Sequence, residues 1–244
     1  MIAGFGLTLA AAAEPPPPTF IDRELHASYT VPVGWEQIPQ KYVDLVSQEA
    51  IRATGQPGIH YLAAYQPKGL QWLTGPYILV SHIVTGGPSL DELRQLMETG
   101  TQQMERKLNS GDSGSIESME VGKPTVDRAR QLIVIPLHAT VTQVGPVLGV
   151  AAMKLGKLGA LQVGFYSPQL LYGRDKPKFE ASLDHIRFEE GYGYTADRDL
   201  AGKVRATLRG WFASEGDFVK VSRFVGGVLG ALAMVFLLTR FRRR

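Results

Sequence analysis

The sequence contains no cysteine. This absence excludes disulfide bonds, thiol nucleophiles and thiolate metal sites, and it leaves the cellular compartment undecided on redox grounds. Lysine and arginine are also missing from the first 22 residues, because Arg23 is the first cation of the chain. A secretory signal peptide usually begins with a basic region, so this N-terminus departs from the usual pattern in that respect.

Charge is distributed unevenly along the 244 residues. Residues 198–244 contain ten lysines or arginines and three acidic residues, whereas residues 1–197 contain sixteen basic and twenty acidic residues. The net charge of +3 therefore reflects the C-terminal part of the chain. The mildly acidic remainder argues against a nucleic acid as the partner.

A long segment without charge lies near the C-terminus, where sixteen mostly apolar residues precede a basic tail. A helix over these residues spans roughly 24 Å, slightly less than the hydrocarbon core of about 30 Å, and flanking cations can snorkel to extend it. We predict one transmembrane helix at 224–239 and a cytoplasmic tail at 240–244, because an excess of Lys and Arg marks the cytoplasmic side. The residues assigned to this anchor are Phe224, Gly226, Gly230, Arg240, Arg242, Arg243 and Arg244.

Small residues recur on one face of this predicted helix. Gly226 and Gly230 are four residues apart, as are Gly227 and Ala231, and this spacing permits two helices to approach closely. The Gly226/Gly230 face is therefore a candidate for self-association, although glycine and alanine are also common in membrane helices that do not pair.

The N-terminus resembles the apolar part of a secretory signal. Residues 1–13 are apolar and end in three alanines before Glu14, as at a small-residue cleavage site. We predict a signal peptide at 1–13 and a proline-rich spacer at 14–18. Together with the charge rule, this places a globular head at 19–190 in the periplasm, anchored in a bacterial-type inner membrane.

The head combines short strands with helices. Strands are predicted at 26–31, 59–65, 77–85, 128–144, 146–155 and 158–166, and helices at 41–53, 89–110 and 177–186. Ser89 and Glu92 form a capping box at the start of the second helix. The short turns between the late strands imply antiparallel pairing. The predicted fold class is therefore α+β, an α/β/α sandwich with an antiparallel sheet covered by helices.

This order of elements, with the stretch Val31-Pro32-Val33-Gly34-Trp35, resembles the PsbP-like superfamily over about residues 25–188. The superfamily includes DcrB-like bacterial envelope proteins. The resemblance implies an α/β/α sandwich and a binding or accessory role. It carries no shared catalytic motif, so it assigns no active-site residue, and the C-terminal anchor is not part of its pattern.

Two short motifs mimic known sites. Residues 111–115 resemble the surroundings of a serine protease nucleophile, but a head interrupted by the helix at 89–110 cannot form the two β-barrels of that family. Residues 156–159 mimic the backbone-clamping loop of an RNA-binding KH domain, yet they join two predicted strands. We interpret both motifs as turns.

Three histidines fall in predicted strands. His60, His82 and His138 could form a metal site if their imidazoles shared one face of the sheet, but no short ligand spacing supports such a site. His82 shares its face with apolar residues, and we interpret it as a packed, hydrogen-bonded core histidine. We assign no catalytic residue, cofactor or metal, and these three histidines are the only metal candidates.

Residues 191–223 connect the head to the anchor. Apolar residues recur there at helical spacing between cations, which is typical of a basic amphipathic helix on anionic headgroups, with Trp211 and Phe212 at the interface. Gly202, Gly210 and Gly216 favour the alternative, a partly ordered linker.

The function expected from these features is that of a non-catalytic, membrane-anchored periplasmic module. Its expected partners are the lipid bilayer and another membrane or envelope protein. Two alternatives remain: an envelope hydrolase with an unrecognised site, and a tail-anchored protein with a cytoplasmic head.

Overall fold

The computed structural model describes residues 16–54, 60–84, 90, 94, 98, 116–142 and 144–195. The strands found there are β1 (Thr19–Asp22), β2 (Ala27–Thr30), β3 (Trp35–Gln37), β4 (Ala63–Pro67), β5 (Tyr77–Val84), β6 (Ile116–Val121), β7 (Thr125–Asp127), β8 (Leu132–Val141), β9 (Gly145–Leu155), β10 (Gly159–Pro168) and β11 (Ile186–Phe188). The helices are α1 (Gln40–Thr54), α3 (Gln169–Ser182) and the short 3-10 helix η1 (Leu183–His185).

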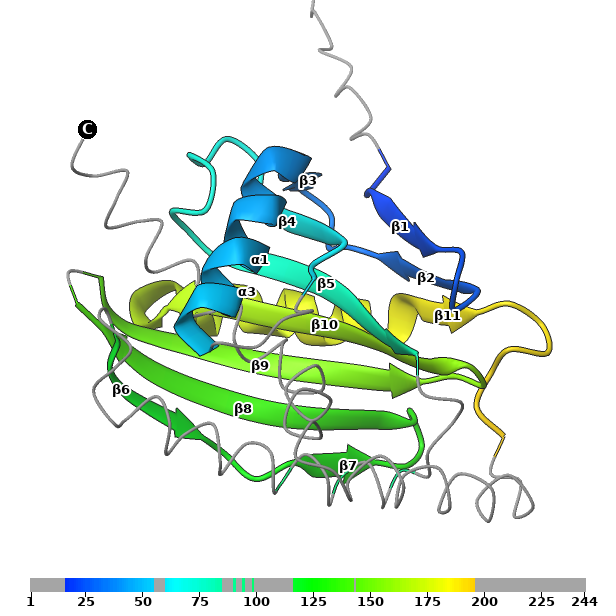
Figure 1. Ribbon diagram of the computed structural model, residues 1–244. Helices are drawn as coiled ribbons and strands as arrows, with labels where there is room; N and C mark the ends of the chain where they lie inside the picture. The colour runs from blue at the N-terminus through cyan, green and yellow to red at the C-terminus, as the bar shows by residue number, and fades with distance from the viewer. Residues whose placement is uncertain are drawn as a thin grey trace, which may run out of the picture.

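One large antiparallel sheet forms the centre of the head (Figure 1). Its strand order is β3-β4-β5-β10-β9-β8-β6, and β7 pairs with the other half of β8. The central strand β10 is buried along nearly its whole length. This agrees with its continuous run of apolar and small residues, because a strand covered on both faces does not alternate between apolar and polar side chains.

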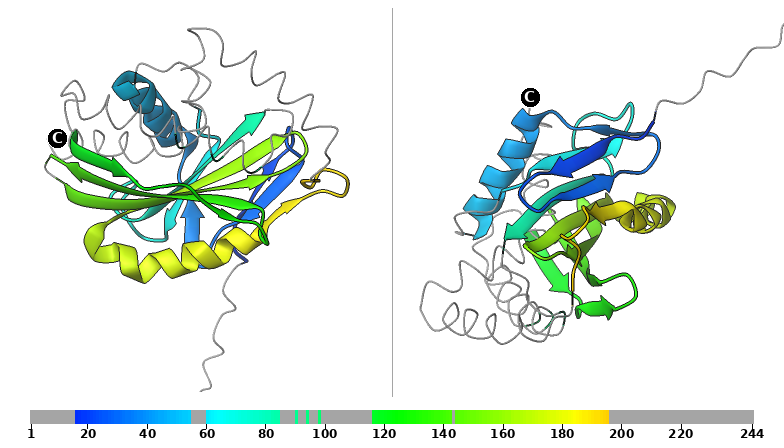
Figure 2. Two further views of the ribbon diagram at one scale, coloured as in Figure 1. Left: turned by 90° about the horizontal axis from the view of Figure 1, so that it is seen from below. Right: turned by 90° about the vertical axis from the view of Figure 1, so that its right-hand side faces the viewer.

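Helix α1 covers one face of this sheet (Figure 2). Val43, Val46 and Ala50 are spaced three and four residues apart on α1, so they lie on one side of the helix. All three are buried in a cluster with Ala64 and Leu79 of the sheet. The amphipathic pattern of the sequence therefore explains both the formation of α1 and its orientation.

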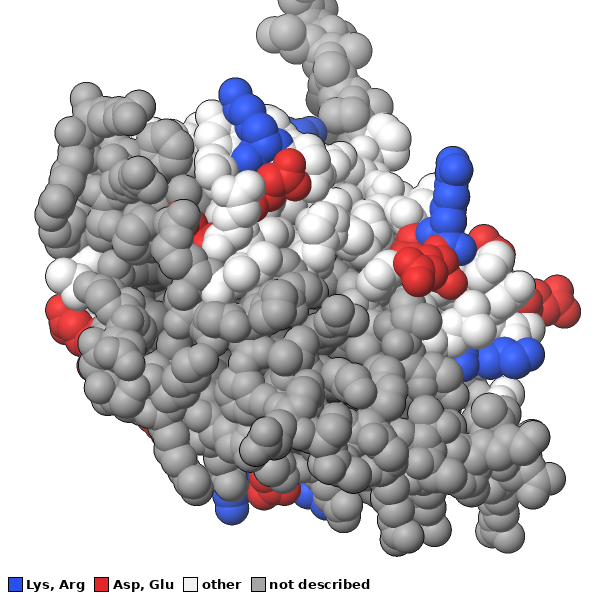
Figure 3. Space-filling view, viewed as in Figure 1, with Lys and Arg blue, Asp and Glu red and all other residues white. Residues whose placement is uncertain are grey.

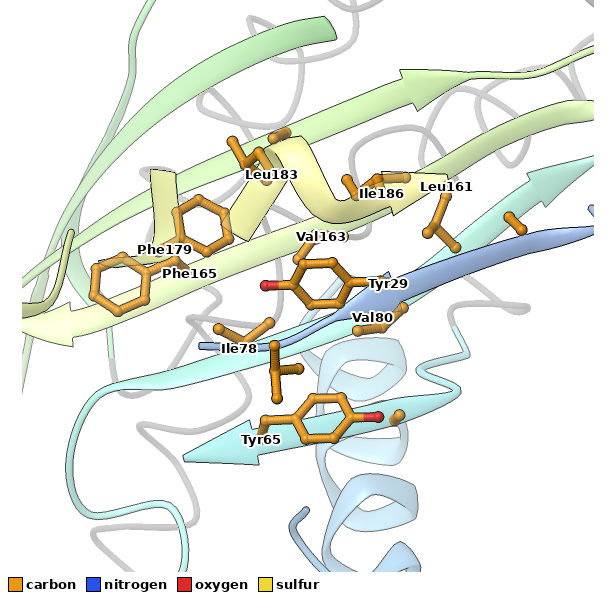
Figure 4. Packing of buried hydrophobic residues seen from close by; sticks show 14 of the residues in the cluster. Tyr29, Tyr65, Ile78, Val80, Leu161, Val163, Phe165, Phe179, Leu183 and Ile186 are labelled. Carbon is orange, nitrogen blue, oxygen red and sulfur yellow. The ribbon is translucent and has the colours of Figure 1, made fainter. Parts of the chain in front are cut away.

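The opposite face carries α3 and a second sheet of three strands, in the order β1-β2-β11. Phe179 of α3 stacks on Phe165 of β10 with ring centroids 5.3 Å apart, and Ile186 of β11 is buried in the same cluster. Figure 4 shows these side chains around Tyr29 of β2. The hydroxyl of Tyr29 lies 2.7 Å from Ser182 Oγ, so this buried polar group is satisfied.

The α+β class and the antiparallel sheet predicted from the sequence are confirmed. The predicted helices at 41–53 and 177–186 correspond to α1 and α3, but α3 begins eight residues earlier than predicted. Proline is favoured in the first turn of a helix, which made Pro177 look like a start, whereas it lies inside α3. The helix also ends before Ile186, because residues 186–188 form a strand that pairs with β2.

Several predictions fall on residues outside the described ranges. Leu90, Arg94 and Glu98 are described within the predicted 89–110 helix, and all three are helical. The following predicted features lie outside the described residues: the rest of that helix, residues 111–115, the signal peptide, Trp211, Phe212 and the anchor from Phe224 onward. Within the described ranges, no helix has the length and hydropathy required of a membrane span.

Candidate functional site

The carboxylate of Asp22 organises the turn between β1 and β2. Its Oδ1 accepts hydrogen bonds from the backbone N–H groups of Glu24 and Leu25, both at 2.9 Å. Aspartate commonly closes a turn in this way, by bonding to the backbone two residues further along. Its Oδ2 lies 2.7 Å from Nδ1 of His82 in β5. This buried side chain therefore ties the small sheet to the large one.

His82 lies between two carboxylates. Its Nδ1 donates to buried Asp22, and its Nε2 lies 3.5 Å from Oε2 of the exposed Glu24. The hydrogen bond to Asp22 raises the pKa of His82 more than burial lowers it. Burial alone would raise the pKa of Asp22, but the bonds from His82 and from the two backbone amides outweigh it, and that pKa is lowered. The pair therefore favours its ionised form.

This pair should give the stability of the head a defined pH dependence. A raised His82 pKa contributes stability that is complete below its ordinary value of 6.5 and is lost as the pH rises through the folded-state pKa. A lowered Asp22 pKa contributes stability that is complete above its ordinary value of 3.8 and is lost on acidification through the folded-state pKa. We expect the pair to stabilise most between about pH 4 and 6.5.

Guanidinium unfolding of the purified chain between pH 5 and 9, followed by tryptophan fluorescence, measures this dependence. In His82→Gln, the loss of stability above pH 6.5 should become smaller than in the unsubstituted chain. His138→Gln removes an exposed histidine of β8 and should leave the dependence unchanged. An unchanged dependence in His82→Gln would refute the assignment.

A second histidine–carboxylate pair adjoins the first. Nδ1 of His26, the last residue of the β1–β2 turn, lies 2.8 Å from Oε2 of Glu189. The imidazole stacks on the ring of Tyr192, with centroids 3.7 Å apart, and the N–H of Glu189 donates to the carbonyl of His26 at 2.9 Å. His26 therefore fixes the segment that follows β11.

That segment, residues 189–193, is the exit segment of the head. The carbonyl of Tyr192 accepts a hydrogen bond from the N–H of Lys157 at 2.9 Å, and Gly193 forms an isolated β-bridge with Gly156. A Cβ on Gly156 would lie 2.3 Å from the ring of Phe188, so any larger residue at this crossing would force the ring to move. The exit segment is thus held by the β9–β10 turn as well as by the β1–β2 turn.

We call this cluster the histidine junction: Asp22, Glu24, His26, His82, Glu189 and Tyr192. Both ring nitrogens of His82 face carboxylates, an arrangement that holds a proton rather than one that activates a nucleophile. In the described part of the chain, no group of three or more His, Asp or Glu residues is placed to hold a metal ion. The junction can therefore fasten three segments and respond to pH.

The structure separates the three histidines considered as metal ligands. His60 is exposed and precedes β4 rather than lying in a strand. The row of paired residues that contains His82 runs through Leu161 of β10 and ends at Leu132 of β8. His138 lies six residues further along β8 than Leu132, so it is not in this row. His82 is hydrogen-bonded as predicted, although it is only partly buried.

The other members of the junction were missed by the sequence analysis. Asp22 and His82 are sixty residues apart, and His26 and Glu189 are separated by 163. The only local signal is the group of polar residues Asp22, Arg23, Glu24 and His26, which is common in exposed turns.

One solved structure that is similar to the chain is the solution structure of cyanobacterial PsbP (CyanoP) from Synechocystis sp. PCC 6803. The match covers 75% of this chain and 98% of that chain, with 11% sequence identity and a TM-score of 0.45. It agrees with the resemblance predicted from the order of elements, at the level of the fold alone. No family model and no curated protein matches the chain.

Proposed function

We propose that this chain is a non-catalytic binding or accessory module, exported by residues 1–13 and anchored by a transmembrane helix at 224–239. Its head lies in the periplasm and acts on another membrane or envelope component. The residues that would form the anchor and its flanks are those derived from the sequence, from Phe224 to Arg244.

The observation that carries this proposal is the fixing of the exit segment. Residues 189–193 are held by the β1–β2 turn and by the β9–β10 turn, so the first three residues of the linker predicted at 191–223 pack on the head. Such an exit gives the chain that leads to the predicted anchor a defined starting point on the head. An enzyme would instead require titratable groups that converge on a substrate, whereas the ionised pairs of the junction bind each other.

Reporter fusions test the topology on which this proposal depends. A reporter active only in the cytoplasm should be active when it is fused after Arg244. It should be inactive when it is fused after Thr195, because the head is then exported without the anchor. The second fusion made without residues 1–13 serves as the control and should be active. Activity of the exported-head fusion would rule out a periplasmic head and favour a tail-anchored cytoplasmic protein.

A further inference from the structure

The two ends of the large sheet differ in chemistry. The end that carries the histidine junction is charged: the β1–β2 turn contains Arg23 and Glu24, the segment before β8 contains Arg128 and Arg130, and the exit segment contains two carboxylates. Figure 3 shows Lys, Arg, Asp and Glu side chains gathered at the right-hand side, over the β1–β2 turn and the exit segment. Such an end interacts favourably with water and poorly with apolar surroundings.

The opposite end, which we call the apolar end, includes four connections and the start of β6, where Ile116 pairs with Val141. The four connections are residues 31–34, 68–76, 142–144 and the first turn of α3, residues 169–172. The strand registers place them together, because Trp35 pairs with Pro67, Tyr77 with Tyr166, and Pro168 with Val147. Lys68 is the only charged residue in these connections.

Exposed apolar side chains concentrate at this end. Leu170 is 97% exposed, Val33 57% and Leu70 38%, and each comes from a different connection. Trp72 and Tyr172 are partly buried in the same connections. Ile21 on β1 is the one other large hydrophobic residue of comparable exposure among the described residues. One carboxylate adjoins these side chains, since Oε1 of Glu36 accepts a hydrogen bond from the N–H of Gly69 at 3.1 Å. Exposed apolar side chains and aromatic rings are favoured at the surface of a bilayer.

The linker is long enough to bring this end to a membrane. Residues 196–223 can extend to roughly 90 Å, whereas β9, which runs between the two ends, measures about 37 Å. An exit from the charged end therefore does not prevent the apolar end from reaching the bilayer that holds the proposed anchor.

We propose that the apolar end is a second membrane contact, which inserts Val33, Leu70 and Leu170 into the interfacial layer of the lipid bilayer. This inference rests on the membrane anchor of the proposed function. Because the three inserted side chains are apolar, the contact depends on apolar burial. It should therefore form on zwitterionic lipid and resist salt, unlike a basic patch on anionic headgroups.

The absence of cysteine makes a direct test simple. Single variants Leu170→Cys and Val33→Cys, with Ile21→Cys as the matched exposed control, are labelled with an environment-sensitive dye. Each full chain is then reconstituted into phosphatidylcholine vesicles. The dyes at 170 and 33 should show a blue-shifted emission and about a twofold loss of intensity when lipids with a quencher on the acyl chain are included. The dye at 21 should show neither effect, and 1 M salt should change nothing.

A second variant separates lipid contact from other causes. Leu170→Asp is combined with Val33→Cys, and the dye is attached at position 33. The emission of this dye should then return toward that of the exposed control at position 21, because a carboxylate resists transfer into lipid. A dye at 170 that is as exposed as the dye at 21 would overturn the contact. So would a dye that is shielded from water but not quenched by lipid, since it would indicate a protein surface. Flotation of the chain with vesicles after an alkaline wash reports on the anchor separately, so its failure would contradict the proposed function instead.

Discussion

Replacement of Asp22 by alanine is expected to lower the free energy of unfolding of the head by about 2–4 kcal/mol at neutral pH. The change leaves the N–H of Leu25 without its acceptor in a buried position and removes the carboxylate from His82. Losing a charged acceptor costs more than losing a neutral one, because its hydrogen bonds are stronger. Guanidinium unfolding monitored by tryptophan fluorescence measures the loss, since Trp35 is only 2% exposed.

Two further variants show which bonds of Asp22 matter. Asp22→Asn retains an oxygen for the backbone amides but removes the charge that faces His82, so its stability should lie between those of the unsubstituted chain and the alanine variant. Glu24→Gln changes an exposed carboxylate in the same turn and should alter stability by less than about 0.5 kcal/mol. Equal stability of Asp22→Ala and Glu24→Gln would show that Asp22 does not hold the turn.

Replacement of Tyr166 by phenylalanine is expected to stabilise the head by about 1–2 kcal/mol. The Tyr166 hydroxyl is fully buried and has no hydrogen-bond partner among the described residues. Its ring, which stacks on Tyr77 at 5.3 Å, is retained in phenylalanine. The substitution therefore removes the desolvation cost of the hydroxyl and keeps the packing.

Tyr29 provides the matched comparison. Its hydroxyl is equally buried but lies 2.7 Å from Ser182 Oγ, so Tyr29→Phe should destabilise the head by about 1 kcal/mol. The two variants delete the same atom type and should change the melting temperature in opposite directions. A loss of stability in Tyr166→Phe comparable to that in Tyr29→Phe would mean that the Tyr166 hydroxyl is satisfied after all.

The predictable part of this fold is the part governed by neighbouring residues. Strands β8, β9 and β10 follow from apolar runs separated by the turns at Gly145-Pro146 and Gly156-Lys157, and α1 follows from its periodic apolar face. These elements need no knowledge of distant segments. The α+β class and the antiparallel pairing of the late strands therefore agree with the sequence analysis.

The strands that were missed are short or depend on distant pairing. Strands β1, β3, β7 and β11 have only three or four residues, too few for a periodic signal, and β6 was missed as well. Strand β1 pairs with the adjacent β2, whereas β11 pairs with β2 from the other end of the head. Their formation is decided by tertiary packing rather than by local propensity. The histidine junction could not be predicted for the same reason, because it forms only where this small sheet meets β5.

The order of the small sheet also determines when the head can finish folding. Ala27, near the start of the head, pairs with Phe188, near its end. Such a pairing has to close a loop that spans nearly the whole domain, which makes it a late and slow event. Synthesis proceeds from the N-terminus, so the chain cannot complete the small sheet or the histidine junction until residue 188 has been synthesised. The head thus remains incompletely folded until that point, which is the state that the proposed export would require.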